Sequence, residues 1–180
     1  GVLVVNSPGG NTIAAAEHTI AMMLALSRNI PIANSSTFLG KWERKKFVGN
    51  ELFKKKLGVV GLGKIGTHVA KVANALGMDV YGYDPFVSSE RAQQLQVRLS
   101  ELKTLFEESD YVTLHLPRTA ETENLVDMKV LKSMKKNAKL INCARGGIID
   151  EEALAEALNN SLIGGAAIDV FAKEPLDSNS

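Results

Sequence analysis

The chain has 180 residues, of which 45% are hydrophobic and 23% charged, and its formal net charge is +1. These values are typical of a globular domain and exclude a strong basic field that would favour nucleic acid or an anionic membrane. No apolar run approaches the roughly 20 residues of a membrane helix, and no signal peptide is visible. The single cysteine excludes an internal disulfide and suits a reducing compartment, so we expect a cytoplasmic protein.

The chain starts in an apolar run at 1–5 that predicts a short buried strand, and no initiator methionine precedes it. We therefore expect a piece of a longer protein. Apolar residues at three- and four-residue steps then predict a helix over about 13–28, capped by Asn11 or Thr12. His18 lies within this helix and is expected to be a packed, hydrogen-bonded core residue. Because the helix is apolar over much of its circumference, we expect it between layers or subunits.

A second helix is predicted from Pro31 to near Gly40, and a basic segment with two aromatic residues follows at 41–47. One interpretation of this segment is an arm that docks a partner or meets a phosphate. The other is a solvated connector that Trp42 and Phe47 anchor. Together with the first helix, the segment suggests a homodimer.

Strand and helix patterns alternate from residue 53 onward, which is typical of an α/β fold with a doubly wound parallel sheet flanked by helices. The predicted strands are 56–60, 79–83, 97–99, 111–115, 139–142 and 165–170. The predicted helices are about 65–76, 88–95, 101–108 and 151–158, with a further helix that buries Val130, Leu131 and Met134. Gly77 is expected to end the first of these helices, and Ser100 and Asp150 are expected to cap two others.

A glycine-spaced turn, Gly61-Leu62-Gly63-Lys64-Ile65-Gly66, joins the first of these strands to its helix. A bare G-x-G-x-x-G is weak evidence, but here a strand precedes it, a helix follows it, and Asp84 closes the next strand. Gly61 would allow the tight turn, Gly63 the approach of a pyrophosphate, and Gly66 close packing of helix on strand. Because the N–H groups and positive end of the helix dipole favour phosphate, the turn predicts a dinucleotide site.

Asp84 lies 18 residues after Gly66, about where an acid that binds the ribose belongs. A carboxylate accepts hydrogen bonds from both ribose hydroxyls and repels a 2′-phosphate. No Arg or Lys is adjacent, so the sequence favours NAD over NADP. In the alternative interpretation, Asp84 serves only the turn before Pro85.

The other strand ends carry further candidates at the edge where open parallel sheets bind ligands. They are His115, Leu116, Pro117, Cys143, Ala144, Arg145, Asp169 and Glu174. Arg145 is the strongest catalytic candidate, because its two-donor fork matches a carboxylate or an α-keto acid and would polarise the carbonyl that receives hydride. The alternative for Arg145 is a salt bridge to a nearby carboxylate.

The roles expected of Glu174, His115 and Cys143 depend on their neighbours in the sequence. Glu174 would orient a catalytic histidine and raise its basicity, or it is a loop charge. His115 is expected to be a wall or cofactor contact rather than an acid–base group. Cys143 has no histidine partner in its sequence context and is expected to line the pocket as a small residue. No cluster has the spacing of metal ligands, so no metal is predicted.

Four ordered motifs resemble the D-2-hydroxyacid dehydrogenase family: 61–66, 115–117, 142–147 and 169–175. The resemblance covers nearly the whole chain and implies an NAD-binding Rossmann domain over 1–180. About 1–52 would form linking helices and a dimerisation arm, and 53–175 the core. It also implies a separate substrate domain that this chain does not contain.

The resemblance assigns each site residue a role. Lys64 and Ile65 would lie along the pyrophosphate, Asp84 would hold the adenosine ribose, and Leu116 and Pro117 would bound the adenine pocket. The nicotinamide half would face Asp169 and the run from Cys143 through Ala144 to Arg145. Arg145 would also bind the substrate carboxylate and carbonyl. Glu174 would pair with a catalytic histidine beyond the Glu-Pro step, so we expect this chain to bind cofactor without turnover.

Within the family, 40–47 and 142–147 are most similar to the branch that oxidises 3-phosphoglycerate to 3-phosphohydroxypyruvate, the first step of serine synthesis. One alternative is a sister dehydrogenase that acts on glyoxylate, hydroxypyruvate or lactate-like acids. The other is an NAD-sensing dimeric binding protein similar to the family's transcriptional co-repressors.

Overall fold

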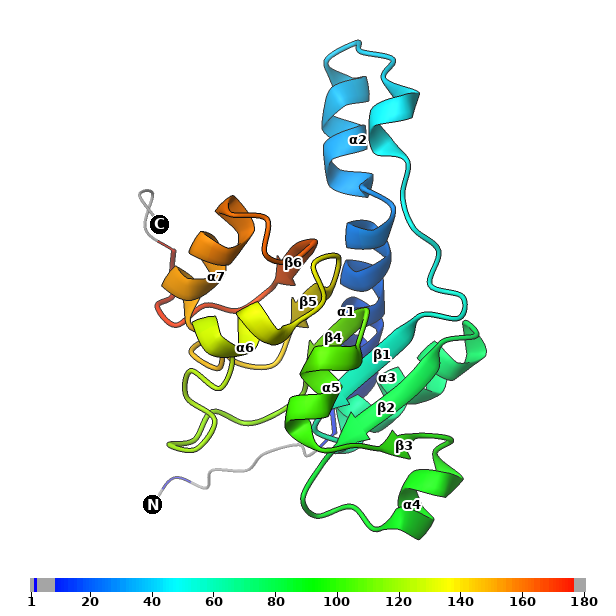
Figure 1. The fold of residues 1–180 in the computed structure, drawn as a ribbon, viewed down its shortest axis with the longest axis vertical. Helices are drawn as coiled ribbons and strands as arrows, with labels where there is room; N and C mark the ends of the chain where they lie inside the picture. The colour runs from blue at the N-terminus through cyan, green and yellow to red at the C-terminus, as the bar shows by residue number, and fades with distance from the viewer. Residues whose placement is uncertain (1, 3–8, 177–180) are drawn as a thin grey trace.

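The computed structural model describes residues 2 and 9–176, and within them the chain forms one six-stranded parallel sheet (Figure 1). The strand order is β3-β2-β1-β4-β5-β6. Their bounds are β1 Lys56–Val60, β2 Asp79–Tyr83, β3 Arg98–Leu99, β4 Tyr111–Leu114, β5 Lys139–Asn142 and β6 Gly165–Ile168. The predicted doubly wound sheet is therefore confirmed.

The strand β1 lies between β2 and β4, and this position creates the ligand crevice. The chain runs from β1 to β2 and β3 on one side, then crosses back to β4 on the other. The connections reverse direction at this point, so a crevice opens beyond the carboxyl ends of β1 and β4. Backbone bonds close the strand ends there: Gly61 N donates to Tyr83 O (2.8 Å) and His115 N to Val60 O (2.7 Å).

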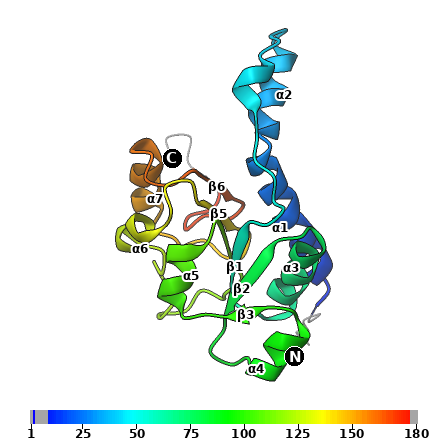
Figure 2. The same ribbon diagram turned by 45° about the vertical axis from the view of Figure 1, so that its right-hand side comes forward.

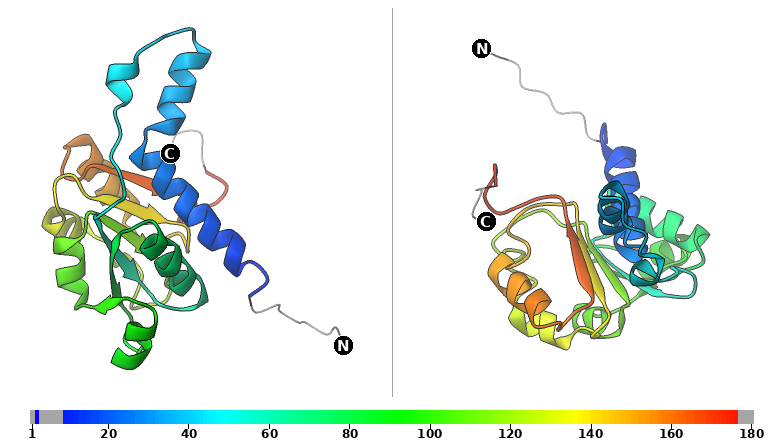
Figure 3. Two further views of the ribbon diagram at one scale, coloured as in Figure 1. Left: turned by 90° about the vertical axis from the view of Figure 1, so that its right-hand side faces the viewer. Right: turned by 90° about the horizontal axis from the view of Figure 1, so that it is seen from above.

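Helices cover both faces of the sheet (Figures 2 and 3). One face carries α1 (Thr12–Ser27) and α3 (Lys64–Ala75), and the other carries α5 (Leu102–Glu108), α6 (Met128–Ser133) and α7 (Glu151–Asn159). Alternate residues of β1 supply the two cores, since Leu57 and Val59 pack on the α1 side and Val60 on the other. Burial on both faces explains the nearly continuous apolar run of this strand.

The short helix α4 (Ser89–Gln94) lies beside β3 at one edge of the sheet (Figure 1). The helix α2 (Ile30–Phe38) and the 3₁₀ turn η1 (Arg44–Phe47) instead extend away from the sheet (Figures 1 and 3). Phe38 is 89% exposed and Trp42 79% exposed. The expectation that Trp42 anchors a connector is therefore wrong within this chain, although Phe47 is half-buried. Across the described residues, every helix is too short or too polar to span a bilayer.

Local capping follows the sequence at some helices and departs from it at others. Asp150 Oδ1 accepts from Ala153 N (3.0 Å) as predicted, and Gly77 follows α3 with φ +76°. Ser100 does not cap α5, whose preceding residue is Glu101. Asn11 precedes α1, but its side chain makes no capping bond. The strand predicted at 1–5 falls outside the described residues, except for Val2, which is exposed and in no strand.

Candidate functional site

The three glycines of the turn after β1 differ in the space that surrounds them. A Cβ on Gly61, where φ is +94°, would lie 2.6 Å from the His115 carbonyl oxygen. A Cβ on Gly66 would lie 1.9 Å from the Gly61 carbonyl oxygen. A Cβ on Gly63 would have no atom within 4 Å. The first two glycines are therefore required by packing, while Gly63 borders open space that a ligand backbone can approach.

The helix α3 begins at this open space, and no side chain caps its start. Its first backbone N–H groups and the positive end of its dipole therefore lie at the border of the crevice. Lys64 is the first helical residue and adds a positive charge there, while Ile65 packs into the core on the α1 side. An uncapped helix start beside an open glycine fits the pyrophosphate of a dinucleotide.

Asp84 ties the turn to the end of β2. Its Oδ2 accepts from Leu62 N (2.8 Å), and its Oδ1 accepts from Phe86 N (2.9 Å). The turn-forming role is therefore real. Each carboxylate oxygen accepts more than one hydrogen bond, so a ribose hydroxyl has acceptors left. The ribose-binding role of Asp84 stays a prediction.

His115, Leu116 and Pro117 follow β4 on the other side of the crevice. His115 Nε2 lies 3.0 Å from Thr113 Oγ1, and burial lowers the pKa of the imidazole to about 4. A ring with this low pKa is a weak base near pH 7, which favours a wall or contact role over acid–base work. Leu116 is half-buried beside Gly61, and Pro117 is exposed.

The loop after β5 presents Arg145. Buried Asn142 holds this loop, because its Nδ2 donates to Arg145 O (3.0 Å) and its Oδ1 accepts from Ala144 N (3.0 Å). The Arg145 side chain is exposed, donates from Nη1 to Ala144 O (2.6 Å), and makes no ion pair with any described carboxylate. The alternative interpretation of Arg145, a salt bridge to a nearby carboxylate, is therefore not seen among the described residues. Asn142 was missed as a positioning residue, although a polar residue ending an apolar strand was a usable signal.

Glu174 lies in the loop after β6, which packs through its backbone against the loop that carries Arg145. A Cβ on Gly146 would lie 1.8 Å from the Phe171 carbonyl oxygen, so the loops after β5 and β6 touch beside Arg145. Glu174 Oε1 accepts from Phe171 N (2.9 Å), and the Glu174 residue is exposed. Arg118 pairs with Glu123 and packs against Gly147.

His18 was wrongly predicted to be a core residue. Its Nε2 lies 3.1 Å from Asp169 Oδ1, and the two side chains are 48% and 46% exposed. Asp169 follows β6, and its backbone N donates to Asn142 O (3.0 Å), so α1 reaches the carboxyl edge of the sheet. No local pattern relates His18 to a residue so distant in sequence, which is why sequence reasoning missed the contact.

Cys143 completes this group from the loop after β5. The ligand-type atoms of His18, Cys143 and Asp169 lie within 4.8 Å of one another, although no sequence spacing had predicted a metal cluster. The direct contact between His18 and Asp169 holds two of these three side chains together. Burial raises the pKa of the Cys143 thiol, with Asp169 adding to the effect. A protonated thiol here agrees with a pocket-lining role.

Comparison with known proteins identifies relatives of this arrangement. Residues 20–180 match the family model described as D-isomer specific 2-hydroxyacid dehydrogenase, NAD binding domain. The D-3-phosphoglycerate dehydrogenase of Synechocystis sp. is 61% identical over 98% of this chain and 32% of its own length. That of Archaeoglobus fulgidus is 53% identical over 97% of this chain and 33% of its own length. The chain therefore spans about a third of these curated relatives.

A solved structure shares the fold. The D-lactate dehydrogenase of Aquifex aeolicus, in complex with NAD and lactic acid, superposes with a TM-score of 0.87 at 34% identity. The match covers 97% of this chain and 52% of that one.

Gly63, which precedes α3, and Gly66 in its first turn offer a matched pair of substitutions. Gly66→Ala is expected to lower the free energy of unfolding by about 2 kcal/mol or more, because the new methyl group overlaps the Gly61 carbonyl. Gly63→Ala is expected to keep near wild-type stability but to weaken NADH binding at least about tenfold. Urea denaturation and calorimetry measure the two effects. If Gly63→Ala left NADH affinity intact, the pyrophosphate would not lie at this turn.

The buried imidazole of His115 predicts a pH-dependent stability. Its folded pKa of about 4 lies below the ordinary value of 6.5, so the unfolded chain binds more protons between these pH values. Stability is therefore expected to fall by up to roughly 3 kcal/mol from this group as pH drops from 6.5 to 4. His115→Gln removes that part of the pH dependence. Parallel denaturation curves for both proteins across this range would contradict the assignment.

Proposed function

We propose that this chain, which belongs to the NAD-binding domains of the D-isomer specific 2-hydroxyacid dehydrogenase family, holds the cofactor of a 3-phosphoglycerate dehydrogenase. The parent enzyme would oxidise 3-phosphoglycerate to 3-phosphohydroxypyruvate, the first step of serine synthesis. Curated relatives that are 61% and 53% identical carry this activity in their names. The observation that carries the dehydrogenase part of the proposal is Arg145, an exposed guanidinium free of carboxylate partners among the described residues, on the sheet edge that also carries the glycine turn. The choice of 3-phosphoglycerate as substrate rests on the identity to these named relatives.

The residues around the crevice fit NAD in a defined order. Gly63 and the start of α3 would hold the pyrophosphate, with Lys64 and Ile65 beside it. Asp84 would accept from the adenosine ribose. Leu116 and Pro117 would bound the adenine. When bound, NAD supplies the ring that accepts a hydride.

The nicotinamide half would lie against the group formed by Cys143, Ala144 and Asp169. His18 Nε2 donates to Asp169 Oδ1 and so restricts the orientation of that carboxylate. The protonated Cys143 adds a small apolar surface next to the ring position. These residues orient the cofactor and transfer no proton themselves.

Arg145 and Glu174 would act on the substrate side. The guanidinium would bind the substrate carboxylate and stabilise the carbonyl that develops as hydride leaves. A histidine would take the hydroxyl proton, and Glu174 would orient it through a hydrogen bond. His115 does not suit this task, because its lowered pKa makes it a weak base and its Nε2 is in contact with Thr113. We therefore assign the proton transfer to a histidine outside this chain.

A second candidate is a sister dehydrogenase for a lactate-like acid. It is favoured by the structural match to a D-lactate dehydrogenase crystallised with NAD and lactic acid. Arg145 would bind the carboxylate of either substrate, so this residue does not separate the two. An NAD-sensing dimer similar to the co-repressors of the family is a third alternative.

We further propose that the arm formed by α2 and η1 pairs with a second copy of the chain. Large apolar side chains, including those of Ile32, Phe38, Leu39 and Trp42, are more than half exposed along it. Clustered apolar exposure away from the main body is typical of a protein interface. We place the homodimer in the cytoplasm, in keeping with its single free cysteine.

The substrate proposal is tested on the full-length protein with 3-phosphoglycerate and NAD. Arg145→Ala is expected to lower kcat/KM by about 10²–10³, because a charge-stabilising donor is lost, while NADH affinity changes far less. Arg91→Ala on α4 is the matched control and should change neither quantity. Equal losses of turnover and NADH affinity would make Arg145 a cofactor residue. NADH formation with D-lactate but not with 3-phosphoglycerate would favour the sister dehydrogenase. Dimerisation promoted by NAD, without turnover of either substrate, would favour the NAD-sensing protein.

The arm is tested by sedimentation at micromolar concentration. The wild-type chain is expected to sediment as a dimer, and the double variant Phe38→Asp, Trp42→Asp as a monomer with an unchanged circular dichroism spectrum, because the interface loses its apolar surface. Phe86→Asp is the control, since Phe86 is 93% exposed but lies outside the arm. A dimer that persists in the double variant would exclude the arm as the interface.

A further inference from the structure

A lysine-lined cavity lies at the amino edge of the sheet, opposite the cofactor site. It has a volume of about 490 Å³ and lies where β1, β4 and β5 begin. Its charged lining residues are Lys55, Asp110, Lys135, Lys136 and Lys139. Four positive groups therefore surround the cavity with one carboxylate among them. Its volume is within the range of small-molecule sites, about 300–1,000 Å³.

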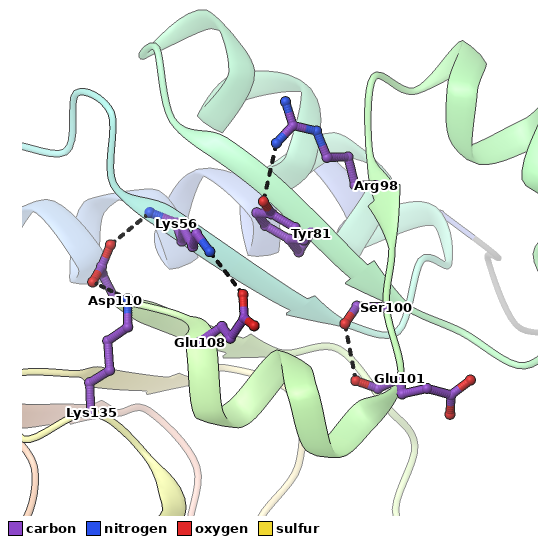
Figure 4. A network of polar contacts seen from close by, with 8 residues as sticks. All are labelled: Lys56, Tyr81, Arg98, Ser100, Glu101, Glu108, Asp110 and Lys135. Atoms are coloured by element: carbon purple, nitrogen blue, oxygen red, sulfur yellow. Dashed lines mark hydrogen bonds and ion pairs between the residues drawn. The ribbon is translucent and has the colours of Figure 1, made fainter.

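The carboxylate of Asp110 is already engaged on both oxygens. Oδ1 pairs with Lys135 Nζ at 2.8 Å, and Oδ2 accepts from the backbone N–H of Lys56 at 2.9 Å (Figure 4). The neighbouring Lys56 side chain extends to Glu108 instead, with its Nζ 2.9 Å from Oε2 (Figure 4). Asp110 thus balances Lys135 and anchors the start of β1, and it does not pair with the other lysines.

Lys55, Lys136 and Lys139 make no ion pair with any described residue. Lys139 is 9% exposed, and its Nζ lies 5.3 Å from the centre of the Tyr111 ring. Buried lysines are normally paired, and an aromatic face offsets only part of the cost of burying an ammonium. Burial lowers the pKa of Lys139, and the positive charge of Lys55 lowers it further. The cavity lining therefore carries an excess of positive charge, part of it withdrawn from water.

We propose that this lysine pocket binds a small phosphate-bearing anion, at a site separate from the cofactor crevice. Lysine is a common ligand of phosphate, to which it acts as a compact positive charge with three donors. Asn50 and Asn137 also line the cavity, and asparagine is a residue type with neutral donors for further oxygens. The pocket goes beyond the proposed dehydrogenase function and does not depend on it.

Inorganic pyrophosphate is the probe, titrated calorimetrically into the 180-residue chain at fixed ionic strength. Excess NADH occupies the glycine turn, so that heat from that phosphate site does not contribute. The wild-type chain is expected to bind one equivalent, and Lys139→Met to weaken binding at least about tenfold. Lys55→Gln and Lys136→Gln are expected to weaken it severalfold. Lys132→Gln, at an exposed residue of α6 outside the lining, is the control of equal charge change and should bind as the wild type does.

Thermal melting gives a second readout that separates binding from folding. Without pyrophosphate, Lys139→Met is expected to melt no lower than the wild type, because it removes an uncompensated buried charge. With pyrophosphate, the wild type and Lys132→Gln should gain the most melting temperature, the Lys55 and Lys136 variants less, and Lys139→Met the least. If Lys139→Met does not fold, the exposed Lys55 and Lys136 variants carry the test. Unchanged binding in the lining variants, an equal loss in Lys132→Gln, or tighter binding of a short single-stranded RNA than of pyrophosphate would overturn the proposal.

Discussion

The candidate site depends on the close backbone contact between the turn after β1, the first turn of α3 and the end of β4. Gly66 lies against the Gly61 carbonyl, and Gly61 lies against the His115 carbonyl, with no space for a Cβ at either glycine. Asp84 adds β2 to this arrangement by accepting from Leu62 N. Three strands and one helix are thereby held around a single turn. The helix start can face a ligand because its neighbours leave it no freedom to move away.

A second contact of the same kind holds the catalytic candidates. The side chain of Asn142 makes two hydrogen bonds within its own loop, and Gly146 lets the Phe171 carbonyl approach. Arg145 and Glu174 thus lie on two loops that touch, rather than on independent flexible segments. Buried polar groups are costly when unpaired, so the fully bonded Asn142 defines one conformation for the loop. The guanidinium remains exposed on a restrained backbone, as an anion-binding residue requires.

The two edges of the sheet carry different chemistry. At the carboxyl edge, charged groups of both signs lie on loops held by backbone contacts, with an uncapped helix start as the phosphate-binding element. At the amino edge, lysines collect where three strands begin, and Asp110, the acidic residue of the cavity lining, is already bonded. The carboxyl edge is suited to an extended dinucleotide, and the amino edge is suited to a compact anion. The net charge of +1 conceals this difference, because it sums over both edges.

Most of the architecture was determined by the sequence alone. Strand and helix patterns between 53 and 170 located the six strands within about two residues, because buried parallel strands and their helices have distinct periodicities. The glycine spacing identified the turn, since only glycine tolerates those contacts. Tertiary structure alone decided which distant residues meet: His18 with Asp169, Cys143 beside both, and Lys139 with Lys55. Local patterns record which face of an element is buried, but the charges that face one another depend on how separate elements pack.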